Sequence, residues 1–203
     1  MNRRKFCLSG AAAAISGAAV GLARLPAGET APVTLAASTP PVRLYKFIYD
    51  GRFPAGRAFG AAARYARTTA GTAAIGGDIT ALWCRDLQPR WSAGGGAIAG
   101  MTTARTLFCL EQLARDHWMR VVVRAEHAIF RGHGVTHRLT APEPMMPRMR
   151  SALAAENWPA KMPAALTIWE DTVRAPRMTR AVGSSYGHRF GVMDEALVSF
   201  VIA

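Results

Sequence analysis

The sequence predicts an α/β fold with a mainly parallel sheet flanked by helices. The first observation is that apolar runs typical of strands alternate with helical segments through much of the chain. The second is residues 97–126, where a short apolar run, a glycine, two threonines, an amphipathic helix and a valine-rich run follow one another. This order predicts a strand–helix–strand unit with parallel strands. A β-hairpin extension and a C-terminal strand complete the predicted fold, a single domain over residues 38–203.

The elements before this unit follow from residue composition and from turn signals. β-Branched and aromatic residues predict a strand over residues 42–49, and an alanine-rich run predicts a helix over 55–67. Glycines then precede a short strand at 72–75. A second helix is expected over 79–87, and Pro89 is expected to end it.

The elements after the unit are a hairpin, a helical region and a terminal strand. Residues 124–130 and 135–140 are predicted to pair as a hairpin, and residues 197–202 (LVSFVI) form the terminal strand. Prolines interrupt the region between them, so only short helices are expected there, at 148–156 and 163–169.

Residues 1–37 have the composition of an export signal and a flexible lead-in. A basic start precedes a mildly apolar segment of small residues, Ala11–Leu22. This segment is short and rich in Ala and Gly, which is typical of a removable signal rather than of a membrane-spanning helix. The sequence is compatible with cleavage of the signal after Ala31 or after Ala37. The alternative to a removable signal is an uncleaved membrane anchor.

The start of this leader resembles a twin-arginine (Tat) signal peptide of bacteria. Residues 2–8 read NRRKFCL, and the resemblance rests on Arg3 and Arg4 and the residues that follow them. Asn2 stands where the motif often has Ser or Thr, and Cys7 stands where Leu is usual. The resemblance covers only the leader. It implies export of the folded chain to the periplasm or beyond by the twin-arginine machinery, a route often taken by cofactor-bearing proteins or their partners.

The charge of the chain bears on its partners. The net charge is +12, and removal of the leader lowers it to +9. The excess is almost wholly arginine and is spread along the sequence. Nucleic-acid-binding proteins more often have a basic run with interleaved aromatic residues, and no such run is present. We therefore expect no nucleic-acid partner, whereas a small anionic ligand is compatible with the charge.

Polar residues follow three predicted strands, at ends that a parallel sheet brings to one edge. In open α/β sheets this edge holds the ligands, and a helix N-terminus there favours anions. The sequence thus predicts a small-molecule cleft, with two threonines as donors at the glycine turn and a polar rim. Its candidate residues are Asp50, Arg52, Asp78, Gly100, Thr102 and Thr103. The alternative is that the glycine only makes a turn and the polar residues only cap helices or turns.

The predicted hairpin carries three histidines. His127, His133 and His137 lie close in sequence, with Glu126 adjacent, and such residues can bind zinc or copper. Their spacing fits no established motif, and strand alternation places His127 and Glu126 on opposite faces. The alternative is that these histidines are exposed or hydrogen-bonded.

Two further motifs involve potentially reactive side chains. After removal of the leader, two cysteines remain, Cys84 and Cys109, and both lie on predicted helices. The sequence is compatible with a disulfide between them, with two buried thiols and with a catalytic thiol. Residues 183–187 match G-x-S-x-G around Ser185, but no strong strand is predicted before them, as a nucleophile elbow requires.

These observations favour an exported, periplasmic protein that binds a small ligand or serves as an accessory protein, with a polar cleft at the carboxyl ends of its strands. The sequence identifies no cofactor. One alternative is a periplasmic enzyme, either a hydrolase that uses Ser185 or a metal enzyme that uses the histidine hairpin. Another is an interaction subunit of an exported redox complex. The expected partners are a small anionic ligand, the twin-arginine machinery and a co-exported protein.

Overall fold

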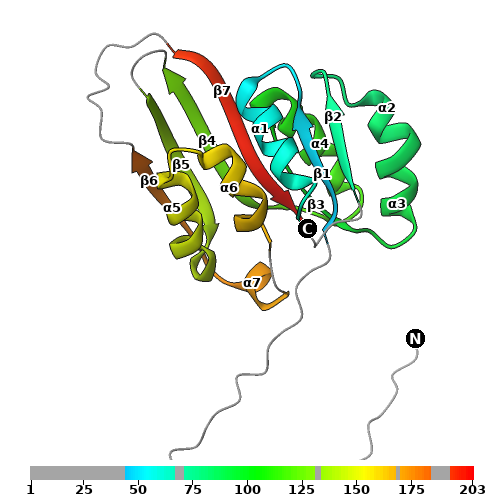
Figure 1. The fold of residues 1–203 in the computed structure, drawn as a ribbon. Coiled ribbons are helices and arrows are strands. Elements are labelled where there is room, and N and C mark those ends of the chain that lie inside the picture. The colour runs from blue at the N-terminus through cyan, green and yellow to red at the C-terminus, as the bar shows by residue number, and fades with distance from the viewer. Residues whose placement is uncertain (1–43, 67–70, 131–133, 168–169, 184–192) are drawn as a thin grey trace, which may run out of the picture. The chain divides into compact units, whose positions relative to one another are not determined.

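A computed structural model describes residues 44–66, 71–130, 134–167, 170–183 and 193–203, which belong to one compact unit spanning Ser38–Ala203 (Figure 1). The leader lies outside the described residues. The strands are β1 (Leu44–Asp50), β2 (Thr72–Ile75), β3 (Ala97–Thr103), β4 (Val121–Phe130), β5 (Gly134–Pro142), β6 (Arg177–Gly183) and β7 (Met193–Ile202). The helical segments are α1 (Pro54–Ala63), α2 (Thr80–Leu82), the π-helix η1 (Trp83–Leu87), α3 (Gln88–Ser92), α4 (Ala104–Arg115), the 3-10 helix η2 (Glu143–Met145), α5 (Met146–Ala154), α6 (Trp158–Ala165) and α7 (Glu170–Arg174).

The strands form one seven-stranded sheet in the order β2-β1-β3-β7-β4-β5-β6. The fold is therefore α/β, as predicted, but the prediction of a mainly parallel sheet was wrong. Only the pairs β2–β1 and β1–β3 are parallel, and the other four neighbouring pairs are antiparallel. The sheet is mixed.

The C-terminal strand β7 is the cause of this difference. It lies between β3 and β4 and is antiparallel to both, so that Ile202 pairs with Ile98 on one side and with Val121 on the other. The predicted strand–helix–strand unit exists, but β7 splits its two strands. Residues 197–202 are all buried, and a continuous apolar run of this kind is typical of a strand covered on both faces. Because β7 lies in the middle of the sheet, both of its faces can be covered.

Two predicted pairings are confirmed. β1 and β3 run parallel, with Ile48 opposite Gly100, and β4 and β5 form an antiparallel hairpin in which His127 lies opposite His137. One helix boundary was wrong. The helix predicted to end at Pro89 continues to Ser92, because the chain widens into the π-helix η1 just before the proline. A residue without a backbone N–H can then sit in the first turn of α3.

Helices cover both faces of the sheet. In Figure 1, α1, α5 and α6 lie in front of it, and their core residues Phe59, Met149 and Trp158 cluster with Phe47 of β1. A second core on the other face joins Leu107 and Leu110 of α4 to neighbouring strands and to α3. Among the described residues, no helix has the length and apolar character needed to cross a bilayer.

The path of the chain places a topological switch point between β1 and β3. After β1 the chain passes through α1 on one face and reaches β2 on one side. After β3 it passes through α4 on the other face and moves in the opposite direction along the sheet. The two connections diverge at the carboxyl ends of β1 and β3. This is where ligands bind in open α/β sheets.

Candidate functional site

Several predicted site residues meet at this edge of the sheet. We use the name switch-point cluster for Asp50, Arg52, Gly77, Asp78, Thr102, Thr103 and Thr106. These residues come from the ends of β1 and β3, from the connections after β1 and β2, and from the first turn of α4. The two additions to the predicted residues, Gly77 and Thr106, link these segments.

Asp50 and Arg52 form a bidentate ion pair. Arg52 Nη2 lies 2.7 Å from Asp50 Oδ2, and Arg52 Nε and the Arg52 backbone N–H both donate to Asp50 Oδ1, at 3.0 and 3.1 Å. The hydrogen bonds that Arg52 donates to the Asp50 side chain raise the pKa of Arg52 above its usual value. The carboxylate is fully buried, whereas half of the arginine side chain is exposed. Asp50 therefore fixes a guanidinium whose outer edge remains open to solvent.

The connection after β2 packs directly on this guanidinium. A Cβ atom on Gly77 would lie 2.4 Å from Arg52 Nη2, and the φ angle of Gly77 is +94°, so only glycine suits this position. The Gly77 carbonyl also accepts a hydrogen bond from Thr106 Oγ1 at 3.3 Å. Through Gly77, the Asp50–Arg52 pair is held next to the first turn of α4.

The two predicted threonines have different roles. Thr103 caps α4, because its Oγ1 accepts a hydrogen bond from the Thr106 backbone N–H at 3.3 Å. Thr102 is fully buried, and its Oγ1 has no hydrogen-bond partner among the described residues. It follows Met101, the last residue of β3 that pairs with β1, and it pairs with Val198 of β7 on its other side. A buried hydroxyl without a partner costs free energy and requires an explanation.

The other two predicted residues have structural roles. Asp78 is exposed and accepts hydrogen bonds from the Thr80 backbone N–H and Oγ1 at 2.8 and 2.7 Å, which lower its pKa. Gly100 was interpreted as a turn residue, but it lies in the middle of β3. A Cβ atom there would approach the Ile48 carbonyl oxygen to 2.3 Å, so glycine is needed for close packing of the strands.

A second polar cluster lies in the core between the sheet and α6. His127 Nδ1 and His137 Nδ1 are 2.8 Å apart, and His127 Nε2 is 2.8 Å from Ser199 Oγ. The ring of Trp158 covers both imidazoles, with ring centroids 4.3 and 4.9 Å away. We call Ser199, His127 and His137 the buried histidine network.

Burial sets the protonation of this network. It lowers the pKa of His137 to about 4, and burial together with His137 holds the pKa of His127 well below its usual value. The Leu153 backbone acts in the opposite direction and raises the pKa of His137, but burial has the larger effect. Among the described residues, His137 Nε2 makes no hydrogen bond of normal geometry. Both rings are therefore neutral at pH 7, and one N–H is shared between the two Nδ1 atoms.

A serine next to a histidine that is oriented by a second group is the arrangement of a nucleophilic catalytic site. The low solvent exposure of the three side chains argues against catalysis here. Ser199, His127 and His137 are 0, 1 and 3% exposed, so a substrate cannot reach the hydroxyl. The network is best explained as a set of buried polar groups that hydrogen-bond to one another within the core.

The geometry offers little to a metal ion. The two Nδ1 atoms hydrogen-bond to each other, and Glu126 points to the opposite face, where it pairs with Arg124 at 2.9 Å. The described part of the chain holds no group of three or more potential metal ligands. His133 lies outside the described residues, so the three-histidine site stays a prediction.

The remaining reactive side chains differ from expectation. Cys84 and Cys109 are exposed free thiols, so the expectations of a disulfide and of two buried thiols were both wrong. A strand, β6, ends at Gly183 and so precedes Ser185, contrary to the prediction. Ser185 itself lies outside the described residues.

Sequence reasoning missed Ser199, Trp158 and Thr106, which the tertiary structure brings to these clusters. The only available signal was a polar residue within an apolar strand, as at Ser199 in LVSFVI. Comparisons of the chain with protein-family profiles, with curated proteins and with solved structures found no match.

Proposed function

We propose that this protein is an exported, periplasmic protein that binds a small anionic ligand at the switch-point cluster. The observation that carries the proposal is the half-exposed Arg52 guanidinium, which the buried Asp50 carboxylate holds in place next to the end of β1. The open edge of the Arg52 guanidinium and the N-terminus of α4 would favour a negative charge.

Removal of the guanidinium tests this proposal. We expect Arg52→Gln to weaken binding of the ligand about tenfold, because a charged hydrogen-bond donor is lost. A separate substitution, Thr102→Val, should raise the free energy of unfolding by about 1 kcal/mol, because a buried hydroxyl without a partner is removed. Isothermal titration calorimetry with inorganic phosphate and with succinate measures the first effect, and urea unfolding measures the second.

Arg85→Gln provides the matched control, because Arg85 is an exposed arginine outside the cluster. We expect this control to leave binding unchanged. If neither anion binds the wild-type protein saturably, or if Arg52→Gln binds as tightly as wild type, the proposed anion site is wrong.

The export part of the proposal rests on residues 2–8. We expect the double substitution Arg3→Lys and Arg4→Lys to abolish export, because the resemblance to a twin-arginine signal rests on this pair. Fractionation of bacterial cells followed by immunoblotting measures the share of the chain in the periplasm. The single substitution Lys5→Arg, which keeps the charge, is the control. Periplasmic protein at wild-type levels in the double variant would contradict this route.

A further inference from the structure

The strand β6 forms one edge of the sheet, at the opposite end from β2. It has seven residues and pairs with β5, and no strand of the described chain pairs with its outer side. An exposed edge of this length presents unpaired backbone groups and is a template for another strand.

The register identifies which backbone groups point outward. The Glu143 backbone N–H donates to the Pro176 carbonyl at 3.0 Å, which makes Glu143 and Pro176 a hydrogen-bonded pair at the start of the ladder. Hydrogen-bonded and non-hydrogen-bonded pairs alternate along an antiparallel ladder. Thr179, Ala181 and Gly183 occupy non-hydrogen-bonded positions opposite β5. Their N–H and C=O groups therefore point away from the sheet.

A groove of about 440 Å³ runs beside this edge, between β6 and α5. Helix α5 contributes Arg150, Ser151 and Ala154, and β6 contributes Ala181, Val182 and Gly183. Figure 1 shows α5 directly next to β6. A strand edge beside a helix-walled groove is the arrangement that receives an extended peptide: backbone hydrogen bonds provide affinity, and the groove takes alternate side chains.

The charge of the groove selects the kind of peptide. Arg150 is the only charged side chain among the described residues that line the groove. Arg180 follows on β6, on the same sheet face as Val182, and both arginines are exposed. No carboxylate is among the lining residues, so acidic side chains on the occupant would complement the groove.

The same arginines disfavour a second copy of this chain as the occupant. Antiparallel pairing of two β6 edges would place Arg150 and Arg180 of one copy near those of the other. Like charges across paired strands are destabilising, and basic residues are a common protection against edge-to-edge association.

From these observations we propose that the β6–α5 groove binds an extended, acidic peptide segment of a partner protein, which adds a strand to the sheet at β6. This surface lies at the other end of the sheet from the switch-point cluster. Its function is independent of the small-ligand site.

The test uses labelled peptides and the full chain after leader removal. The probe is a short fluorescein-labelled peptide of alternating valine and glutamate, and the comparison probes are its lysine counterpart and the glutamate peptide with methylated backbone amides. We expect saturable binding of the glutamate peptide by fluorescence anisotropy. The lysine and methylated peptides should bind at least about tenfold more weakly, because they lack the charge match or the backbone donors.

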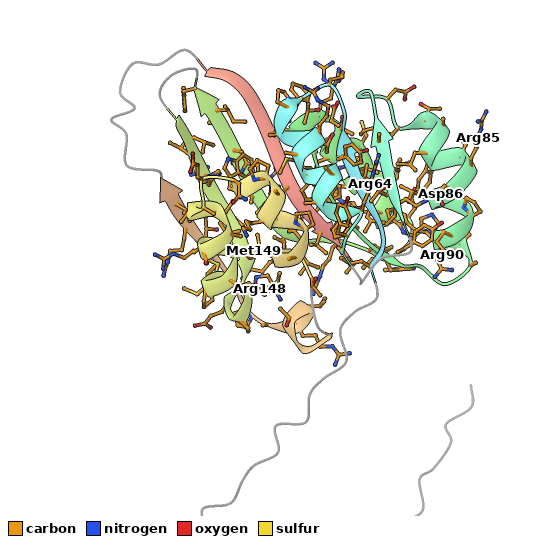
Figure 2. All side chains as sticks on the ribbon, in the orientation of Figure 1. Arg64, Arg85, Asp86, Arg90, Arg148 and Met149 are labelled. Atoms are coloured by element: carbon orange, nitrogen blue, oxygen red, sulfur yellow. The ribbon has the colours of Figure 1, made fainter. Side chains whose placement is uncertain are left out.

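Two pairs of variants locate the site. Ala181→Pro removes an outward N–H without removing a bond to β5, and prolines are tolerated at such edge positions, so we expect about tenfold weaker binding; Ala181→Val keeps the N–H and should bind like wild type. Arg150→Glu should also weaken binding of the glutamate peptide about tenfold. Its control is Arg85→Glu, which changes an exposed arginine at the far end of the domain from Arg148 and Met149 of α5 (Figure 2).

Each result decides the proposal. Loss of binding in Ala181→Pro and Arg150→Glu but not in their controls supports it. If Ala181→Pro fails to fold, as judged by circular dichroism, the methylated peptide and Arg150→Glu test the same contacts. Absence of saturable binding to wild type, equal binding of the methylated peptide, or a dimer abolished by Ala181→Pro would overturn it.

Discussion

We expect acidification from pH 7 to about pH 4 to lower the free energy of unfolding by roughly 3 kcal/mol through His137 and further through His127. Burial lowers the pKa of His137 to about 4 and that of His127 well below its usual value, so both rings stay neutral in the folded protein. In the unfolded chain they take up protons below about pH 6.5. The unfolded state then binds more protons than the folded state, and stability falls as the pH falls.

Urea unfolding at a series of pH values measures this effect. Carboxylates contribute at lower pH: the pKa values of Asp78 and Asp86 are lowered, so the stability that they contribute is lost below about pH 4. The window between pH 6.5 and 4 therefore reports on the histidines. His137→Gln should reduce the slope in this window, because the variant lacks one of the two neutral buried rings. A stability profile that is flat between pH 6.5 and 4 would contradict the neutral buried network.

The second large effect is expected from His127→Ala at neutral pH, a loss of about 3 to 5 kcal/mol in the free energy of unfolding. The substitution leaves a cavity beneath Trp158 and removes the partner of Ser199 Oγ and of His137 Nδ1. Both polar groups are buried, and a buried polar group that loses its partner is costly. Chemical denaturation monitored by tryptophan fluorescence measures the change.

Ser199→Ala provides the graded comparison. It removes only one hydroxyl from the network and should cost about 1 to 2 kcal/mol, because His127 Nε2 loses its partner but no large cavity forms. If His127→Ala costs no more than Ser199→Ala, the imidazole does not hold this part of the core together. In that case the serine–histidine order would require a different interpretation.

The candidate site was predictable in part. The order of strands and helices in the first half placed Asp50 and Thr102 after strands that lie parallel and adjacent, and such strands end at one edge. The sequence could not show that Asp50 is fully buried and bound to Arg52, or that Thr102 Oγ1 lacks a partner. Burial and hydrogen bonding depend on what packs against a residue, and Gly77 and Thr106 come from other connections.

The histidine hairpin illustrates the same limit. Alternation along β4 assigned His127 and Glu126 to opposite faces, and the hairpin register made His127 and His137 neighbours. The third member, Ser199, lies 72 residues beyond His127 in the chain. No local pattern connects the two, because β7 reaches β4 only when the sheet is complete.

The sequence by itself determined the α/β class, the parallel pairing of β1 with β3 and the hairpin of β4 and β5, because hydrophobic periodicity and turn residues act over short distances. Only the tertiary structure decided that β7 inserts between β3 and β4, that the sheet is mixed and that β6 is left as an edge. An apolar run such as LVSFVI specifies a strand buried on both faces but not its neighbours. The pairing partners of a strand depend on the packing of the whole sheet, in which β7 pairs with both β3 and β4.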